Sequence, residues 1–224
     1  HEAAGQVRAL LETVAAHALE CAVDDVRVEA GRAWSVDDVS RTMTVGELAD
    51  LAQRDRDPTS SGSLELEHVF TLPSSAFSFA AHVVVVEVEP ATGELQILRY
   101  AAAHDCGVAV NPLIVEGQIA GGIAQGLGQA MVEVVAHDER GAPSVASFMD
   151  YAVFTAEDMP VIDAQLLSTP TSLTPTGMRG VGEAPSVASP GALANAVADA
   201  LAPLGVGQID LPLTQERIWA AIAT

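Results

Sequence analysis

One carboxylate stands in a turn that glycine and proline dominate. Residues 177–185 read Gly-Met-Arg-Gly-Val-Gly-Glu-Ala-Pro, with Glu183 near the end. Glycine and proline together fix an irregular backbone, and Gly182 removes side-chain bulk beside Glu183, so a ligand can reach the carboxylate. A lone glutamate on a loop is most often a solvated surface residue. The Ala-rich segment that follows favours a second interpretation, because burial against apolar residues tunes a carboxylate for general-base chemistry.

A second candidate is a glycine-rich segment that hydrophobic spacing predicts as a helix over residues 114–132. Each glycine costs a helix about 1 kcal/mol relative to alanine, so something must offset the cost. One explanation is close backbone packing, since Gly117, Gly121 and Gly122 form a face with little side chain. The other is a bulky polar ligand, bound by the amides of Gln118 and Gln125. The spacing matches neither the dinucleotide G-x-G-x-x-G motif nor a Walker loop.

The composition excludes several classes of function. Thirty acidic and ten basic residues give a formal net charge of −20, which repels a phosphate backbone, so we expect no nucleic-acid partner. Cys21 and Cys106 are far apart in the sequence, and this chain by itself is predicted to build neither a zinc site nor an iron–sulfur cluster. We expect reduced cysteines, no membrane span, no signal peptide and a cytoplasmic location.

The elements that must position these candidates are short strands mixed with helices. Further helices are expected over residues 4–22, 45–53, 190–201 and 213–222, with a Thr44/Glu47 capping box, Pro190 at a helix start and Thr214 as a cap. Strands are expected over residues 26–29, 34–36, 64–70, 133–136, 144–149 and 163–167, and a hairpin over 82–89 and 94–103. Without a regular βαβ alternation, this pattern predicts an α+β fold.

A polar stretch over residues 54–63 predicts a linker. It divides the chain into residues 1–63, a linker helix with a small α/β segment, and residues 64–224, a larger domain that contains both candidate segments.

Several other polar residues are interpreted as structural. His82 and His104, in or beside strands, are expected to be packed core residues rather than ligands. Cys106 is expected to be a small buried side chain. Asp105 and Asn111 are expected to organise turns by hydrogen bonding to the backbone.

The ordered set of motifs resembles one known family. It comprises residues 105–107 (Asp-Cys-Gly), 111–112 (Asn-Pro), 115–122 (Val-Glu-Gly-Gln-Ile-Ala-Gly-Gly), 125–128 (Gln-Gly-Leu-Gly), 148–151 (Phe-Met-Asp-Tyr) and 180–183 (Gly-Val-Gly-Glu). This set is similar to the C-terminal half of the molybdopterin-binding large subunits of the xanthine dehydrogenase, aldehyde oxidase and carbon monoxide dehydrogenase family. The likeness runs over nearly the whole chain, and the bacterial carbon monoxide dehydrogenase-like large chains are particularly similar.

The resemblance implies specific roles. Residues 64–224 would be a C-terminal molybdopterin-binding subdomain. In that family the glutamate matching Glu183 takes a proton from a hydroxyl ligand of molybdenum, and the oxygen then attacks an electron-poor carbon. The glutamine matching Gln118 contacts the pterin, expected in its cytosine dinucleotide form. The resemblance assigns a supporting role in cofactor binding to Gly117, Gly121, Gly122 and Gln125, and it assigns the floor of the site to Arg179, Gly180, Val181 and Gly182.

The family's large subunit also has an earlier half with further cofactor contacts, including Gly-Gly-Phe-Gly, Gly-Gln-Gly and Phe-Arg-Gly segments that this chain lacks. The resemblance therefore implies a separate chain with the N-terminal half, a FAD subunit and a subunit with [2Fe–2S] clusters. The expected reaction is oxidative hydroxylation of an aldehyde, N-heterocycle or small carbon substrate with water. The alternative is a non-catalytic remnant or assembly module that keeps the fold. Arg179 stands where many relatives carry lysine, and Pro185 where many carry glycine.

Overall fold

The computed structural model describes residues 1–54, 64 and 66–224. This part of the chain forms two compact units, residues 1–71 and residues 72–224. Each unit is described by itself below. Most of the predicted linker, and the domain boundary predicted at residue 63, lie outside the described residues.

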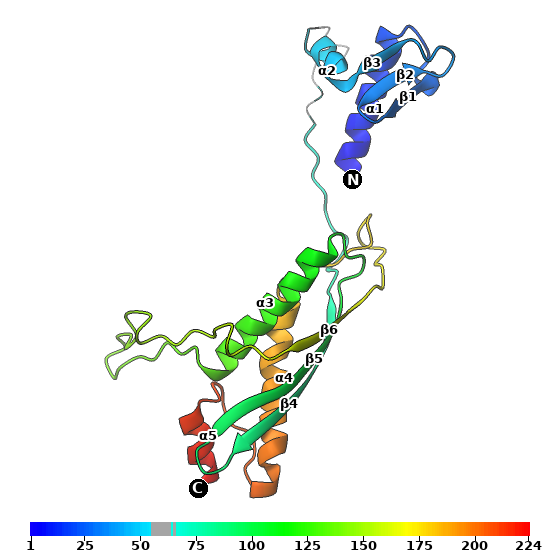
Figure 1. The fold of residues 1–224 in the computed structure, drawn as a ribbon. Coiled ribbons are helices and arrows are strands. Elements are labelled where there is room, and N and C mark those ends of the chain that lie inside the picture. Colours follow the sequence, from blue (N-terminus) through cyan, green and yellow to red (C-terminus); the bar gives the residue numbers. More distant parts are fainter. Residues whose placement is uncertain (55–63, 65) are drawn as a thin grey trace. The chain divides into compact units, whose positions relative to one another are not determined.

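The N-terminal unit packs two helices against a small antiparallel sheet (Figure 1). Its elements are α1 (Glu2–Ala18), the 3-10 helix η1 (Val23–Asp25), β1 (Val26–Glu29), β2 (Arg32–Ser35), β3 (Thr42–Thr44) and α2 (Val45–Arg54), with strand order β1-β2-β3. Its core contains Leu11, Ala15, Ala16, Leu19, Val26, Ala33 and Leu48. The buried residues of α1, Leu11, Ala15 and Ala16, are four and five residues apart and lie on one face, which is the pattern of an amphipathic helix.

The predicted capping box at the start of α2 is confirmed. The backbone N–H of Glu47 donates to Thr44 Oγ1 at 3.1 Å, and the backbone N–H of Thr44 donates to Glu47 Oε2 at 2.7 Å. The strand predicted over residues 64–70 is wrong for the described part of that segment, which is irregular. His68 instead bonds to Glu2 of α1, with 2.9 Å between its Nε2 and the carboxylate. An alternating pattern forms a strand when a partner strand is available.

The C-terminal unit contains a three-stranded sheet and three α-helices (Figure 1). Its elements are β4 (Phe79–Glu89), β5 (Glu94–Asp105), α3 (Pro112–Met131), β6 (Ile162–Leu167), α4 (Ala184–Leu201), the 3-10 helix η2 (Ala202–Leu204) and α5 (Gln215–Ile222). The strand order is β4-β5-β6, with β4 and β5 antiparallel and β5 and β6 parallel. The predicted hairpin and the predicted α+β class are thus observed.

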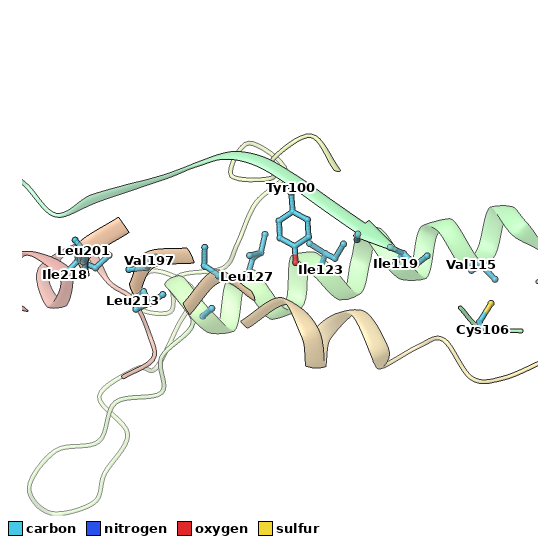
Figure 2. Close-up of a cluster of buried hydrophobic side chains, with 13 residues drawn as sticks. Tyr100, Cys106, Val115, Ile119, Ile123, Leu127, Val197, Leu201, Leu213 and Ile218 are labelled. Atoms are coloured by element: carbon cyan, nitrogen blue, oxygen red, sulfur yellow. The ribbon is translucent and has the colours of Figure 1, made fainter. Parts of the chain in front are cut away.

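The core of this unit lies between one face of the sheet and the helices. In Figure 2 the ring of Tyr100 extends from β5 toward Ile123 of α3. A stripe at four-residue steps, Val115, Ile119, Ile123 and Leu127, buries one side of α3. Facing it are Leu193, Val197 and Leu201 of α4 and Ile218 of α5. Burying a large aliphatic side chain stabilises a fold by roughly 1.5–3 kcal/mol, so this stripe fixes which side of α3 remains outside.

Helix α4 begins earlier than predicted. It starts at Ala184, directly after Glu183, and Pro190 lies inside the helix rather than at its first turn. Pro185 occupies the first turn, where a missing N–H costs nothing. One turn later, the buried Ser189 hydroxyl donates to the Pro185 carbonyl at 2.8 Å, just before the proline that lacks an N–H. The N-caps of α3 and α5, Asn111 and Thr214, accept hydrogen bonds from the backbone as expected.

Two predicted strands are wrong. Residues 133–136 and 144–149 form no strand, and a single bridge between His137 and Pro143 joins the two stretches. The segment between α3 and β6 is irregular, and it exposes Phe148 and Met149 almost completely. The β-propensity of these residues is high, but no strand of the sheet pairs with them. No helix in the described residues is long and apolar enough to cross a membrane.

Candidate functional site

The two segments singled out in the sequence meet in the structure. A Cβ atom placed on Gly182 would lie 3.5 Å from Gln118 Nε2. The amide of Gln118, on α3, therefore lies beside the turn that leads into α4. The structure brings the predicted cofactor residue to within one residue of the predicted base, Glu183.

Close backbone contacts hold this turn in place. Met178 forms a bridge with Gly107, and the N–H of Arg179 donates to the Cys106 carbonyl at 2.6 Å. Gly107 and Gly177 both have positive φ, and a Cβ on Gly107 would collide with the Gly177 carbonyl oxygen at 2.1 Å. These positions require glycine, and they tie the turn to the end of β5.

The side chain of Arg179 joins its turn to two other segments, residues 77–79 and the loop after β6. Its guanidinium donates to the carbonyls of Phe77 at 3.0 Å and Thr169 at 3.3 Å, and it lies 4.9 Å from the centre of the Phe79 ring. In these contacts the guanidinium binds groups of the protein itself. The role predicted for Arg179 in cofactor binding remains a prediction, and its backbone is the part that belongs to the turn.

Asp105 organises the neighbouring loop, as predicted. One carboxylate oxygen accepts from the N–H of Gly107 at 2.8 Å and from the N–H of Thr169 at 3.1 Å. Hydrogen bonds from Thr169 and Gly107 hold the pKa of Asp105 below its ordinary value. The carboxylate thus joins the loop after β5 to the loop after β6.

Glu183 opens onto a pocket of about 580 Å³. The pocket is lined by residues 76–78, 80, 180–184, 187 and 188. The Glu183 carbonyl accepts from the N–H of Val187 at 3.1 Å and from the Ser186 hydroxyl at 2.9 Å, but its side chain does not cap the helix. The expected burial of the carboxylate is wrong for this chain, because Glu183 is exposed.

The glycines of α3 divide between its two sides. Added Cβ atoms would lie 2.8 Å from Pro185 Cβ at Gly122 and 2.0 Å from Ser189 Oγ at Gly126, so these glycines allow α3 and α4 to pack closely. No heavy atom lies within 4 Å of an added Cβ on Gly117 or Gly121. The close-packing explanation therefore holds for Gly122 and is wrong for Gly117 and Gly121, while Gly126, which was not included in it, is also closely packed.

The open side of α3 carries the remaining predicted cofactor residues. Gly117, Gln118, Gly121 and Gln125 are all exposed, and they recur at three- and four-residue steps, which places them on one face of the helix. This face combines bare backbone with two amide side chains. It is suited to a planar polar ligand.

Sequence reasoning missed a buried polar cluster on the inner face of the sheet. His82 Nε2 lies 2.8 Å from His104 Nε2, and His82 Nδ1 lies 2.8 Å from the Tyr100 hydroxyl. Burial and the neighbouring His104 lower the pKa of His82 to about 4, and burial lowers the pKa of His104. His104 Nδ1 is buried without a hydrogen-bond partner among the described residues. The histidines are core residues as predicted, but they are paired rather than isolated.

Among the described residues no group of three or more histidine, cysteine, aspartate or glutamate side chains is gathered as metal ligands are. The polar groups on the open side of α3 include the Gln118 and Gln125 amides, and those that line the pocket include the Glu183 carboxylate, Ser78 and backbone. Such groups recognise an organic cofactor by hydrogen bonds.

A comparison with protein families shows to which family the chain belongs. The family model described as molybdopterin cofactor-binding domain matches residues 1–160, and the chain belongs to this family. The family and the fold class expected from the motifs are confirmed.

Individual relatives are similar over almost the whole chain. The chain is 34% identical over 224 residues to the nicotine 6-hydroxylase large subunit of Paenarthrobacter nicotinovorans, covering 99% of this chain and 28% of that protein. It is 34% identical to the carbon monoxide dehydrogenase large chain of Hydrogenophaga pseudoflava, covering 98% and 27%. The crystal structure of quinoline 2-oxidoreductase from Pseudomonas putida 86 matches with a TM-score of 0.82 at 34% identity, covering 98% and 28%. The chain thus spans little more than a quarter of the length of these relatives.

Proposed function

We propose that the chain is a C-terminal part, shorter than the expected half, of the cofactor-binding large subunit of a molybdenum hydroxylase, with Glu183 as the general base. The observation that carries this proposal is the position of the Gln118 amide beside Gly182, in a chain of the molybdopterin cofactor-binding family. This contact joins the segment that would hold the cofactor to the segment that would perform proton transfer.

The residues on the open side of α3 and in the turn before α4 fit a pterin-type cofactor. Gly117 and Gly121 leave open space above the backbone of α3, and the Gln118 amide offers both a donor and an acceptor to a heterocycle. Gly180 and Gly182 allow a ligand to approach the backbone of the turn closely. When bound, the molybdenum–pterin cofactor supplies the two-electron redox chemistry that protein side chains lack.

The contribution of Glu183 is to accept a proton. The carboxylate stands directly before α4 and lines the pocket, and a carboxylate is a side chain that can act as a general base. Because the side chain does not cap the helix, it is free to turn into the pocket. Glu183 thereby activates a nucleophile derived from water.

The names of the relatives suggest the class of substrate and partners. They are named for nicotine, carbon monoxide and quinoline, which supports an N-heterocycle or a small carbon compound as the substrate. The proposed partners are the rest of the large subunit, a FAD subunit and a subunit with [2Fe–2S] clusters. The proposed cofactor is the cytosine dinucleotide form of molybdopterin, and the proposed location is the cytoplasm.

The test is to assemble the chain with the rest of the large subunit and the partner subunits, and to measure molybdenum content and turnover. We expect bound molybdenum in the wild-type complex. Glu183→Gln should leave assembly and molybdenum content unchanged and lower turnover by roughly 10²- to 10⁴-fold, because an amide cannot accept the proton.

The matched control is Glu139→Gln, an exposed glutamate in the irregular segment between α3 and β6, which should turn over normally. Normal turnover of Glu183→Gln would refute the role of this residue as base. A complete complex that contains no molybdenum would support the alternative, a non-catalytic assembly module.

A further inference from the structure

The outer face of the C-terminal sheet is apolar where a solvated face would be polar. On β4 the side chains that point away from the core are Phe79, Val83 and Val85, with exposed fractions of 61%, 64% and 46%. An antiparallel hairpin with one face in water normally alternates apolar and polar residues. Here the inward residues, among them Val84 and Val86, are also apolar. The sequence of β4 therefore suits a sheet that is covered on both faces.

This apolar surface is confined to one end of the sheet. Beyond the bulge at Val85 and Val86, the outward residues of β4 become Glu87 and Glu89. The apolar end is the one that approaches the candidate site, because Arg179 lies against Phe79 at this end. A covering partner here would therefore lie close to the pocket of Glu183.

The surface also has a defined relief. In the strand register, Val83 on β4 stands opposite Ala101 on β5, which stands opposite Asp163 on β6; the next row is Ala81, Ala103 and Gln165. The alanines of the central strand form the floor of a shallow groove of about 280 Å³. One wall of the groove is apolar and the other is polar. We call this groove, with Phe79 and Val85 at its edge, the outer groove.

We infer that the outer groove binds the part of the large subunit that this chain lacks, through an apolar segment flanked by a basic or amide side chain that reaches Asp163 and Gln165. The inference rests on the proposed function. The relatives are three to four times longer than this chain, which covers 27–28% of their lengths, so a large partner surface is available within the same subunit. A second copy of the chain fits less well, because each copy carries a formal charge of −20 and like charges repel.

The outer groove has a direct test in assembly. The full chain and the rest of the large subunit are expressed as separate polypeptides, and their affinity is measured by sedimentation velocity. Val83→Asp should weaken binding at least 10-fold, because it places a charge in an apolar contact. The chain should still fold, since this side chain is largely exposed. The control Gln96→Asp puts the same charge on the outer face beyond the groove and should bind like the wild type.

A photo-crosslinking amino acid at position 83 identifies the occupant. We expect a covalent product with the rest of the large subunit; crosslinking between two copies of the chain, or to the FAD or iron–sulfur subunit, would overturn the inference. So would wild-type affinity of Val83→Asp. If that variant assembles normally and the complex contains molybdenum, the outer groove is refuted while the proposed function stands. If the wild-type chain does not assemble at all, both fail.

Discussion

The two sides of α3 use glycine for opposite purposes. On the buried side, Gly122 and Gly126 leave no room for even a methyl group, because atoms of α4 occupy the place of the missing Cβ. On the exposed side, Gly117 and Gly121 have open space above them. The first pair fixes the distance between two helices. The second pair weakens the helix with no compensating contact in this chain, which is the expected signature of a surface kept clear for a ligand.

This difference matters for the site because the position of Glu183 depends on the buried side of α3. Glu183 directly precedes α4, the helix that Gly122 and Gly126 hold close to α3. The exposed side presents Gln118 to the same turn. One helix thus sets both the position of the base and the surface for the cofactor, and substitutions on its two sides should separate the two functions.

The largest effect is expected on the buried side, from Gly126→Ala. The new Cβ would lie 2.0 Å from Ser189 Oγ and 3.0 Å from the Ser186 carbonyl oxygen, so α3 and α4 must move apart. We expect a loss of about 3 kcal/mol in the free energy of unfolding of the C-terminal unit, measured with denaturant.

Ser189→Ala in the same chain removes the nearest colliding atom, so the double variant should recover at least 1 kcal/mol relative to additivity. If Gly126→Ala unfolded like the wild type, the close contact between the two helices would not exist in solution.

A smaller effect is expected from acid. Below pH 6.5 the unfolded chain protonates His82, whereas the folded chain, with a pKa of about 4 for this side chain, does not. The unfolded state then binds more protons, so stability falls as the pH drops from 6.5 toward 4. Between pH 7 and pH 5 we expect the C-terminal unit to lose on the order of 2 kcal/mol, measured by denaturant unfolding.

This acid sensitivity should arise in the core between the sheet and the helices, where His82, Tyr100 and His104 lie together. His82→Phe should flatten the pH dependence, whereas the control His137→Gln, at an exposed position, should leave it unchanged. A slope that persists in His82→Phe would assign the titration to another group.

Local patterns in the sequence predicted the parts of the fold that local physics determines. The hairpin of β4 and β5, the capping box of α2, the cap at Thr214 and the hydrogen bond from the backbone to Asn111 are all present. The start of α4 was misplaced because two prolines, Pro185 and Pro190, both suit a first helical turn, and the sequence does not say which one a neighbouring helix contacts.

The arrangement of the candidate site depends on more than local sequence patterns. Pairing counted from the predicted turn would set His82 opposite Ala101 and place His104 on the other face. The bulge between Val85 and Val86 shifts the register by one residue and brings both histidines to the same face, and the sequence pattern does not predict that bulge. The proximity of Gln118 to Gly182 depends on tertiary packing, and it was expected only through the family resemblance. The exposure of Glu183 could not be predicted, because burial depends on what packs across the pocket, and no local pattern encodes that.

The smallest effect on stability is expected on the exposed side, from the double substitution Gly117→Ala and Gly121→Ala. Neither methyl group meets an atom of this chain, and alanine favours a helix over glycine by about 1 kcal/mol per residue at most, so the free energy of unfolding should rise slightly. In the assembled complex the same methyl groups would intrude on the cofactor, and molybdenum content should fall. Gly191→Ala, on α4 with equally open surroundings, should give the gain in stability without the loss of metal. Undiminished molybdenum in the α3 variant would mean that this surface is not kept clear for a cofactor, and the contrast between the two sides of the helix would reduce to packing alone.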